Sequence, residues 1–394
     1  MKKLILSILI VLLCMSSLAL ISCGGDDVTT TATNDITTTT DDNVTTLPPL
    51  DTPTKCVHEE ETIVGKEPTI TSTGLTDGKK CALCGEMLIY QSVIPAKSVI
   101  DGFEYRISDD GTFYSVIGIG NIKDTKAVIP STYNNLPVTR IENEAFKSCA
   151  AITEITLPDS ITYIGKSAFE ACSNLTKVNL PDGIAAIGMA AFRDCAELKS
   201  IVIPKNVTYI SNYTFSGCSK LETVEFHDEI THIGMLSFRD CISLVSVEIP
   251  DSVTRIVDSA FKNCVCLESV KLSKGITVLE KNIFEGCARL KSIEIHEGIT
   301  AIEEDVFRGC RSLTGIVIPS SVTSIGYYAF YGCVSLESIV IPSSVTWIGT
   351  HAFYCCYPIT VFCESPSQPQ KWNSNWVEEY TRIVWNYNNS VELQ

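Results

Sequence analysis

Residues 160–182, SITYIGKSAFEACSNLTKVNLPD, are followed by residues 183–205, GIAAIGMAAFRDCAELKSIVIPK. The two stretches place isoleucine, glycine, alanine-phenylalanine, cysteine and leucine at the same positions. The 23-residue period is kept without insertion through positions 146, 169, 192, 215, 238, 261, 284, 307, 330 and 353, which are all phenylalanine, and a cysteine follows each by three residues. A fixed period of this length is typical of solenoid proteins built from stacked coils.

One unit shows what each coil contains. Residues 175–180 alternate apolar and polar side chains, which predicts a short half-buried strand. Pro181 has no amide hydrogen and ends that strand. Residues 184–187 supply a second buried pair, and Phe192 and Cys195, three apart, predict a single helical or 3₁₀ turn.

Such a unit cannot bury its apolar side alone, but stacked units cover one another. The phenylalanines and cysteines then form continuous interior columns, and each buried phenylalanine contributes about 2–3 kcal/mol. Ten coils at strand spacing make a stack about 50 Å long. The sequence therefore predicts a β-rich, right-handed solenoid of 23-residue repeats with short parallel strands.

Residues 247–264, VEIPDSVTRIVDSAFKNC, and 316–333, IVIPSSVTSIGYYAFYGC, resemble the BspA-like leucine-rich repeat family of bacterial surface proteins. The resemblance implies a leucine-rich-repeat solenoid with N- and C-terminal caps. It places the N-terminal cap at 99–140, the repeats at 141–362 and a tryptophan-rich C-terminal cap at 363–394. It also implies surface adhesion without catalysis.

The N-terminal segment predicts export and lipid anchoring. Residues 1–22 combine two lysines, an apolar run and small residues, as a signal peptide does. Residues 20–24, LISCG, resemble the lipobox of bacterial lipoproteins, which implies lipidation of Cys23; the alternative is an ordinary secretory signal. Residues 23–54, rich in Thr, Asp and Pro, predict a disordered tether. The net charge of −16 argues against nucleic acid as a partner.

Residues 55–98 form a small Cys/His module. Cys56, His58, Cys81 and Cys84 have the ligand types and spacings of a tetrahedral zinc site, and zinc would stabilise a segment with little core. The segment is similar to a small Cys/His module of secreted proteins from Gram-positive anaerobes. The alternative is a disulfide, Cys56–Cys81 or Cys81–Cys84, since an exported protein favours either chemistry.

The cysteines of the repeats predict a column of buried thiols rather than a disulfide ladder. Each faces an equivalent cysteine above and below, so no pairing scheme is preferred. A Cys355–Cys363 staple near the C-terminal cap is an exception that the sequence leaves open. A group of carboxylates in and near one coil predicts a solvated acidic patch, with calcium binding as the alternative; its members are Glu294, Glu297, Glu303, Glu304 and Asp305.

Three classes of function remain: an adhesive binding surface, a structural spacer without ligand, and a glycan-acting enzyme or polysaccharide-binding accessory protein. The sequence has no nucleophile-elbow, zincin or phosphate-loop motif, which disfavours the enzyme. We expect an extracellular, lipid-anchored protein that binds a host extracellular protein, a glycan or a bacterial surface component. Exposed aromatic side chains on the second strands are the first ligand-binding candidates: Tyr163, Tyr209 and Trp347. Exposed valines on the first strands are the second: Val202, Val317 and Val340.

Overall fold

The structure is a computed structural model that describes residues 60–64, 74–75, 78–81, 87–89, 93–94, 102–120 and 124–388. The chain divides into two units, the smaller within Leu18–Ser98 and the larger containing Val99–Gln394. Cys23 and the proposed tether lie outside the described residues. No described helix is long and apolar enough to cross a membrane.

The small unit consists of short antiparallel strands. Strand β3 (Gly78–Cys81) lies between β1 (Glu60–Ile63) and β4 (Met87–Ile89), and β2 (Gly74–Leu75) pairs with β5 (Val93–Ile94). The proposed zinc ligands fall outside this description: Cys56, His58 and Cys84 are not among the described residues, and only the main chain of Cys81 is. The zinc site therefore stays a prediction.

The larger unit begins with a mixed sheet. Strand β6 (Phe103–Ile107) runs antiparallel to β7 (Tyr114–Ile119), and β10 (Leu136–Ile141) lies parallel to β7 on its other side. Strand β9 (Thr132–Tyr133) forms a hairpin with β10, and β8 (Lys126–Val128) pairs with the first repeat. The sheet covers the end of the solenoid, where the buried Phe103 ring lies edge-on to Phe146 at 6.0 Å between centroids.

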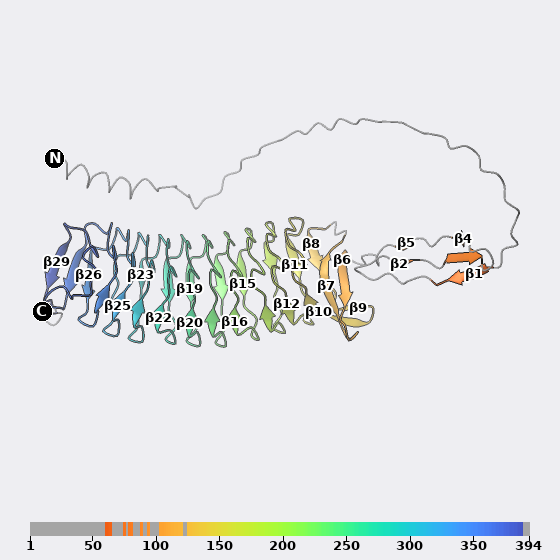
Figure 1. The fold of residues 1–394 in the computed structure, drawn as a ribbon, viewed down its shortest axis with the longest axis horizontal. Helices are drawn as coiled ribbons and strands as arrows, with labels where there is room; N and C mark the ends of the chain where they lie inside the picture. The colour runs from red at the N-terminus through yellow and green to blue at the C-terminus, as the bar shows by residue number, and fades with distance from the viewer. Residues whose placement is uncertain are drawn as a thin grey trace, which may run out of the picture. The chain divides into compact units, whose positions relative to one another are not determined.

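From residue 141 the chain repeats one coil, and Figure 1 shows the coils side by side along the unit. The first strands of the coils pair in parallel with neighbouring coils, at a 23-residue offset through most of the stack, such as Ser200 with Thr223, and at a 22-residue offset in β26–β28–β29, such as Ser338 with Thr360. These strands are β11 (Glu154–Thr156), β13 (Lys177–Val178), β15 (Ser200–Val202), β17 (Thr223–Glu225), β19 (Ser246–Glu248), β21 (Ser269–Lys271), β23 (Ser292–Ile293), β26 (Ser338–Ile341), β28 (Thr360–Cys363) and β29 (Arg382–Trp385).

The second strands form another parallel ladder, in which Tyr209 pairs with His232 and His232 with Arg255. Each has one outward residue followed by a buried isoleucine or leucine, which is the alternation expected of a half-buried strand. They are β12 (Tyr163–Ile164), β14 (Ala186–Ile187), β16 (Tyr209–Ile210), β18 (His232–Ile233), β20 (Arg255–Ile256), β22 (Val278–Leu279), β24 (Ala301–Ile302), β25 (Ser324–Ile325) and β27 (Trp347–Ile348).

The predicted helical or 3₁₀ turn is wrong in its backbone conformation. In every coil the residues two before and two after the phenylalanine have positive φ, as in Leu236 (57°) and Asp240 (60°) around Phe238. A helix needs negative φ throughout, so the segment is a run of tight turns. Alternate amides of the segment bond to the next coil: Phe238 N donates to Ala260 O at 2.8 Å. These hydrogen bonds form a third ladder between coils. They pair main-chain amide and carbonyl groups that a helix would have paired within the segment.

The core is the pair of columns that the repeat predicts. The ten phenylalanine rings stack with centroids 4.9 to 5.9 Å apart, and all are buried. Trp376 ends the column edge-on to Phe353 at 5.8 Å, and Trp372 lies buried against Trp376. The tryptophans thus shield the last coil, as the family resemblance implies.

The repeat cysteines and Cys363 are free thiols, so the proposed Cys355–Cys363 staple is wrong. Burial raises the pKa of Cys172 to about 12 and that of Cys264 well above its usual value. The thiol form is therefore the one present at neutral pH, which agrees with a column of small apolar side chains.

Candidate functional site

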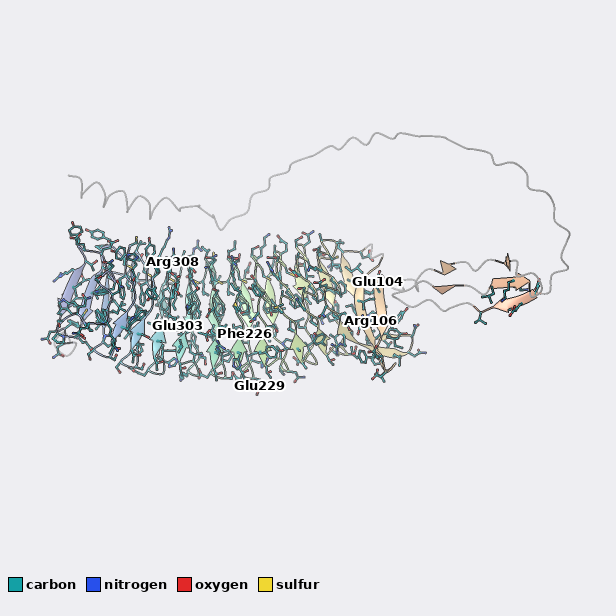
Figure 2. The ribbon with its side chains drawn as sticks, in the orientation of Figure 1. Glu104, Arg106, Phe226, Glu229, Glu303 and Arg308 are labelled. Atoms are coloured by element: carbon teal, nitrogen blue, oxygen red, sulfur yellow. The ribbon has the colours of Figure 1, made fainter. Side chains whose placement is uncertain are left out.

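The coil presents three sides to solvent. We call them the first-strand face (outward residues of β11 to β29 in the first ladder), the second-strand face (outward residues of β12 to β27 in the second) and the turn face (exposed positions around each phenylalanine). In the view of Figure 2, Arg308 of the turn face and Glu229, which precedes β18, lie at opposite edges of the solenoid. A ligand that covers one side of the coil therefore leaves another open.

The first-strand face does not gather its valines. Val202 is 58% exposed and Val317 79% exposed, whereas Val340 is half-buried in β26. Val202 pairs with Glu225 in the next coil, and Glu248 pairs with Lys271 further along. The valines are thus interrupted by charged side chains and form no continuous apolar strip.

The second-strand face holds its aromatic side chains apart from one another. Tyr163 is half-buried with the Arg140 guanidinium 4.1 Å from its ring centroid, while Tyr209 is 48% exposed. Trp347 lies edge-on to the exposed Tyr327 at 5.3 Å. The three predicted aromatic residues are therefore separate anchors, and Tyr327 is a neighbour that the repeat pattern did not single out.

The threonines beside these strands have a structural role. The Thr231 hydroxyl donates to the Thr208 carbonyl at 2.9 Å, and Thr254 does the same to Thr231 at 3.3 Å. Further bonds of this kind join Thr300 to Thr277 and Thr346 to Thr323. Threonine hydroxyls that already form hydrogen bonds between coils contribute little to the recognition of a ligand.

Carboxylates collect on the second-strand face where two glutamates replace the glycine of the repeat. Asp258, Glu280 and Glu303 come from successive coils, and Arg255 pairs with Glu280. Burial and the neighbouring carboxylates raise the pKa of both Asp258 and Glu303. The group repels its own charge, since its three carboxylates share only Arg255 and Lys281, and Lys281 also pairs with Glu304.

The predicted calcium alternative fails for the part of the chain that the structure describes, because no described group of three or more His, Cys, Asp or Glu side chains could hold a metal ion. Three of the five carboxylates of the proposed acidic patch have different partners: Glu297 accepts a hydrogen bond from Ser320, Glu304 pairs with Lys281, and Asp305 pairs with Arg308. They do not act as one site.

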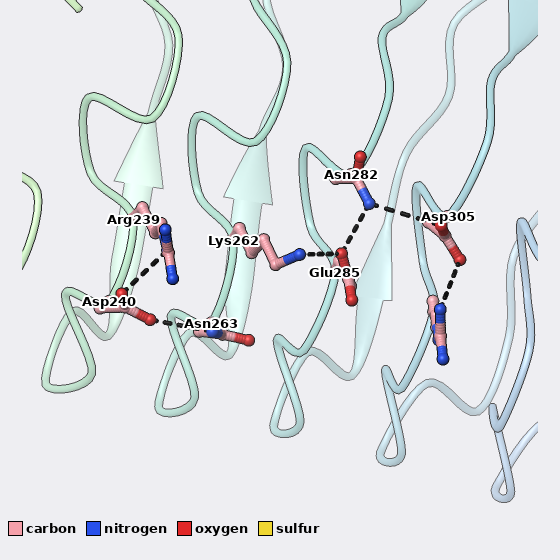
Figure 3. Close-up of polar contacts among 8 residues, drawn as sticks. Arg239, Asp240, Lys262, Asn263, Asn282, Glu285 and Asp305 are labelled. Atoms are coloured by element: carbon pink, nitrogen blue, oxygen red, sulfur yellow. Dashed lines mark hydrogen bonds and ion pairs between the residues drawn. The ribbon is translucent and has the colours of Figure 1, made fainter. Parts of the chain in front are cut away.

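The turn face changes character along the solenoid. Its middle coils carry a network of ion pairs and hydrogen bonds, shown in Figure 3, such as Lys262 Nζ to Glu285 Oε2 at 2.6 Å. Asn263 reaches the Asp240 carboxylate of the preceding coil at 2.9 Å. These pairs are partly exposed and contribute little stability each, but they leave the middle of the face polar and internally paired.

Toward the C-terminus the same positions become aromatic, which the repeat pattern did not reveal. We call Arg308, Tyr328, Tyr331, His351 and Tyr354 the turn-face aromatic cluster. The His351 and Tyr354 rings are 4.0 Å apart, and Tyr328 lies 5.4 Å from His351 and 5.8 Å from Tyr331. Arg308 lies over both Tyr328 and Tyr331, at 5.6 and 5.3 Å. The four rings are half-buried.

A hollow of about 230 Å³ lies next to this cluster, at the junction of the last coil and the C-terminal cap. Two strongly exposed rings line it, Tyr357 (70%) and Tyr380 (69%), together with Glu378 and Arg382. Glu378 Oε1 accepts a hydrogen bond from the Cys355 amide at 3.1 Å, directly after Tyr354. The hollow and the cluster are therefore neighbours.

Comparison with protein families and with solved structures matches this chain to leucine-rich repeat proteins. A model of the BspA type leucine rich repeat region matches residues 139–265 and 231–360, in six copies. A leucine-rich repeat protein of Bacteroides ovatus, known from a crystal structure, is 26% identical over 73% of this chain and 78% of its own, with a TM-score of 0.53. No curated protein matches.

Two further crystal structures are more distant. A leucine rich cell surface protein of Faecalibacterium prausnitzii is 24% identical, covering 74% of this chain and 95% of its own, with a TM-score of 0.39. The pneumococcal vaccine antigen PcpA is 20% identical, covering 73% of this chain and 85% of its own, with a TM-score of 0.48.

Proposed function

The chain belongs to the family of BspA-type leucine-rich repeat proteins, and we propose that it is a cell-surface binding protein that mediates adhesion without catalysis. The observation that carries the proposal is the uninterrupted stack of coils. Backbone ladders on the two strand sides and on the turn face hold each coil to the next, so the exposed positions of many coils form extended, pre-ordered surfaces. Extended solenoid surfaces suit macromolecular partners.

Energetic reasoning supports binding over a passive spacer. Ordering side chains on association costs free energy, and rings already held by neighbours have less freedom to lose. Tyr163 beneath Arg140 and Trp347 against Tyr327 are held in this way. A spacer without a ligand gives no reason for an exposed ring such as Tyr209, or for the half-buried Tyr163 and Trp347, in the second ladder. We propose a host extracellular protein, a glycan or a bacterial surface component as the partner.

Surface display is the other part of the proposal. A lipidated Cys23 followed by a tether would hold the solenoid at the outside of the membrane. Many copies on one cell would then raise the effective concentration of modest sites. Changing Cys23 to serine should release the protein from membranes and abolish lipid labelling; retention of the variant on membranes would contradict the anchor.

A binding experiment tests the function itself. Cells that display the full chain should adhere to a panel of mucin, matrix proteins and polysaccharides better than cells that lack it. Replacing Tyr163, Tyr209 and Trp347 by alanine tests the second-strand face. Replacing Val202, Val317 and Val340 by lysine tests the first-strand face. If neither triple variant changes adhesion and the wild type binds nothing on the panel, the protein is a spacer.

A further inference from the structure

The hollow at the C-terminal cap has the size of a subsite rather than of a complete ligand pocket. Its volume of about 230 Å³ is below the roughly 300–1,000 Å³ typical of sites for drug-sized molecules. It is open to solvent beside two exposed rings, Tyr357 and Tyr380. A site of this size takes one ring-sized unit of a longer chain.

The groups around the hollow have two kinds of chemistry. Tyr357 and Tyr380 offer aromatic faces, whose negative π-clouds attract C–H groups. Glu378, Thr360, Thr381 and Arg382 offer a carboxylate, hydroxyls and a guanidinium. A pyranose ring matches both, because it presents C–H bonds on its faces and hydroxyls around its rim.

Charge decides which sugars fit. Glu378 and Glu379 both lie close enough to Tyr354 to raise the pKa of its phenol, with burial as the larger cause. On the adjoining cluster, Arg308 is paired with Asp305 at 3.3 Å. The hollow is lined by one carboxylate, Glu378, and one guanidinium, Arg382, and Glu379 adds a second carboxylate close to Tyr354. The net charge here is negative, so sulfated or carboxylated sugars would be repelled rather than attracted.

The turn-face aromatic cluster extends the site. Tyr354 and Tyr357 flank the same segment of chain, and from Tyr354 the rings continue through His351 and Tyr328 to Tyr331 in the coil before. Because the rings contact one another, they are already ordered before a ligand arrives. A strip of rings across adjacent coils suits successive units of a polymer.

We propose that this end of the solenoid binds an uncharged polysaccharide, with one sugar ring in the hollow against Tyr357 and Tyr380 and the following units on the turn-face aromatic cluster. This inference rests on the proposed function, since it names the partner class and the surface of a binding protein. Glu378 Oε1 accepts a hydrogen bond from the Cys355 amide, and its second carboxylate oxygen accepts hydrogen bonds from sugar hydroxyls.

Binding of the purified full chain to laminarin, galactomannan and xyloglucan tests the proposal, with heparin and hyaluronan as charged comparators. At least one uncharged polymer should bind, and 0.5 M salt should leave its affinity nearly unchanged. Tyr357→Ala and Tyr380→Ala should each weaken binding about tenfold or more, as truncation of an anchoring ring does. The matched control Tyr213→Ala, a half-buried ring beside Arg193 on the turn face of a distant coil, should have no effect.

A second variant separates binding from folding. In Glu378→Gln the amide oxygen can still accept from Cys355, so the melting temperature should be unchanged while sugar affinity falls several-fold. The inference is overturned if only charged polymers bind, or if every uncharged polymer fails while a protein ligand binds at these residues. In the latter case the proposed adhesive function stands. If neither polysaccharides nor proteins bind, both the polysaccharide inference and the proposed adhesive function are wrong.

Discussion

The thiol of Cys264 donates a hydrogen bond to the main-chain carbonyl oxygen of Phe238 in the coil before, with Sγ and O 3.2 Å apart. The same oxygen accepts from the Cys241 amide within its own coil, also at 3.2 Å. The bond recurs from Cys172 to Cys356, always 26 residues back. Phenylalanine and cysteine therefore repeat together because the cysteine supplies the second donor to a buried carbonyl, a role that alanine cannot fill.

The buried thiols should resist alkylation in the native protein. Burial raises the pKa of Cys172 to about 12, so almost no thiolate is present at pH 8. Iodoacetamide followed by mass spectrometry should modify the half-buried Cys149 and Cys355 first, and Cys172 to Cys333 only in denaturant. Regular crosslinks between successive coils, or rapid labelling of Cys264, would show that the column is not one of buried free thiols.

Removing one ring from the middle of the stack should be costly. Phe238 is fully buried between Phe215 and Phe261, at 5.4 and 5.3 Å. Phe238→Ala should lower the free energy of unfolding by about 3–5 kcal/mol, since it leaves a cavity that rigid coils cannot close. Urea unfolding measures the change, and Tyr209→Ala on the surface is the control. Equal stability of the two variants would place Phe238 outside the core.

The glycine that follows five of the second strands (β12, β14, β18, β25 and β27) lies at a close approach between coils. A Cβ atom on Gly234 would lie 2.6 Å from the Ile210 carbonyl oxygen and 2.8 Å from the Asn212 amide nitrogen. Gly234→Ala should therefore cost about 1–3 kcal/mol through overpacking. At Gly315 a Cβ meets nothing within 4 Å, so Gly315→Ala should change stability by less than about 0.5 kcal/mol. Thermal melts of both variants check the contrast.

The carboxylates of the second-strand face should make stability depend on pH. Burial and the neighbouring carboxylates raise the pKa of Glu303 in the folded state, so just above the ordinary pKa of a glutamate the folded protein binds more protons than the unfolded chain. Stability from this group thus rises as the pH falls from neutral toward that value. Glu303→Gln should raise the melting temperature at pH 7 and have little effect at pH 4.

The control for Glu303 is Glu225→Gln, an exposed carboxylate that loses the same charge. It should shift the melting temperature little at either pH. If Glu303→Gln lowers the melting temperature at pH 7, the carboxylate is stabilising and the repulsion argued from Asp258 and Glu280 is wrong.

The small module should carry metal if its four predicted ligands act together. Cys56, His58, Cys81 and Cys84 would bind about one zinc per purified chain, measured by mass spectrometry of the intact protein and by metal analysis. Cys84→Ala should lose the metal, whereas Cys149→Ala, outside the module, should keep it. A Cys81–Cys84 or Cys56–Cys81 disulfide in the non-reduced protein would rule out the zinc site.

The sequence predicted the strands and the columns because their signals are strictly periodic. Phe238 and Cys264 lie at repeat positions whose environment is nearly the same in every coil. The pattern of one repeat therefore predicts the buried positions of all the other repeats. The turn was missed for a physical reason. Gly286 has the positive φ that glycine favours, but Leu236 does not favour it and adopts it because its amide bonds to Asp258 in the next coil.

The aromatic cluster was missed for the same reason. With the turn taken as helical, Tyr328 and Tyr331 had no assigned direction, and their contact with the next coil was not visible in a single repeat. Tyr357 and Tyr380 come from different parts of the chain, and only the packing of the C-terminal cap brings them to one hollow. Local pattern cannot predict a site built at the point where the pattern ends.

The constant 23-residue spacing of the phenylalanines has an evolutionary consequence. Unequal recombination between two similar repeats removes or adds one whole coil, and every remaining Phe still meets a Phe, because Phe215 would stack on Phe261 as it now does on Phe238. A deletion of any other length shifts all later rings out of line. Related proteins can therefore gain or lose whole coils, which changes the length of the solenoid. The two ends of the solenoid, and the surfaces that they form, stay unchanged.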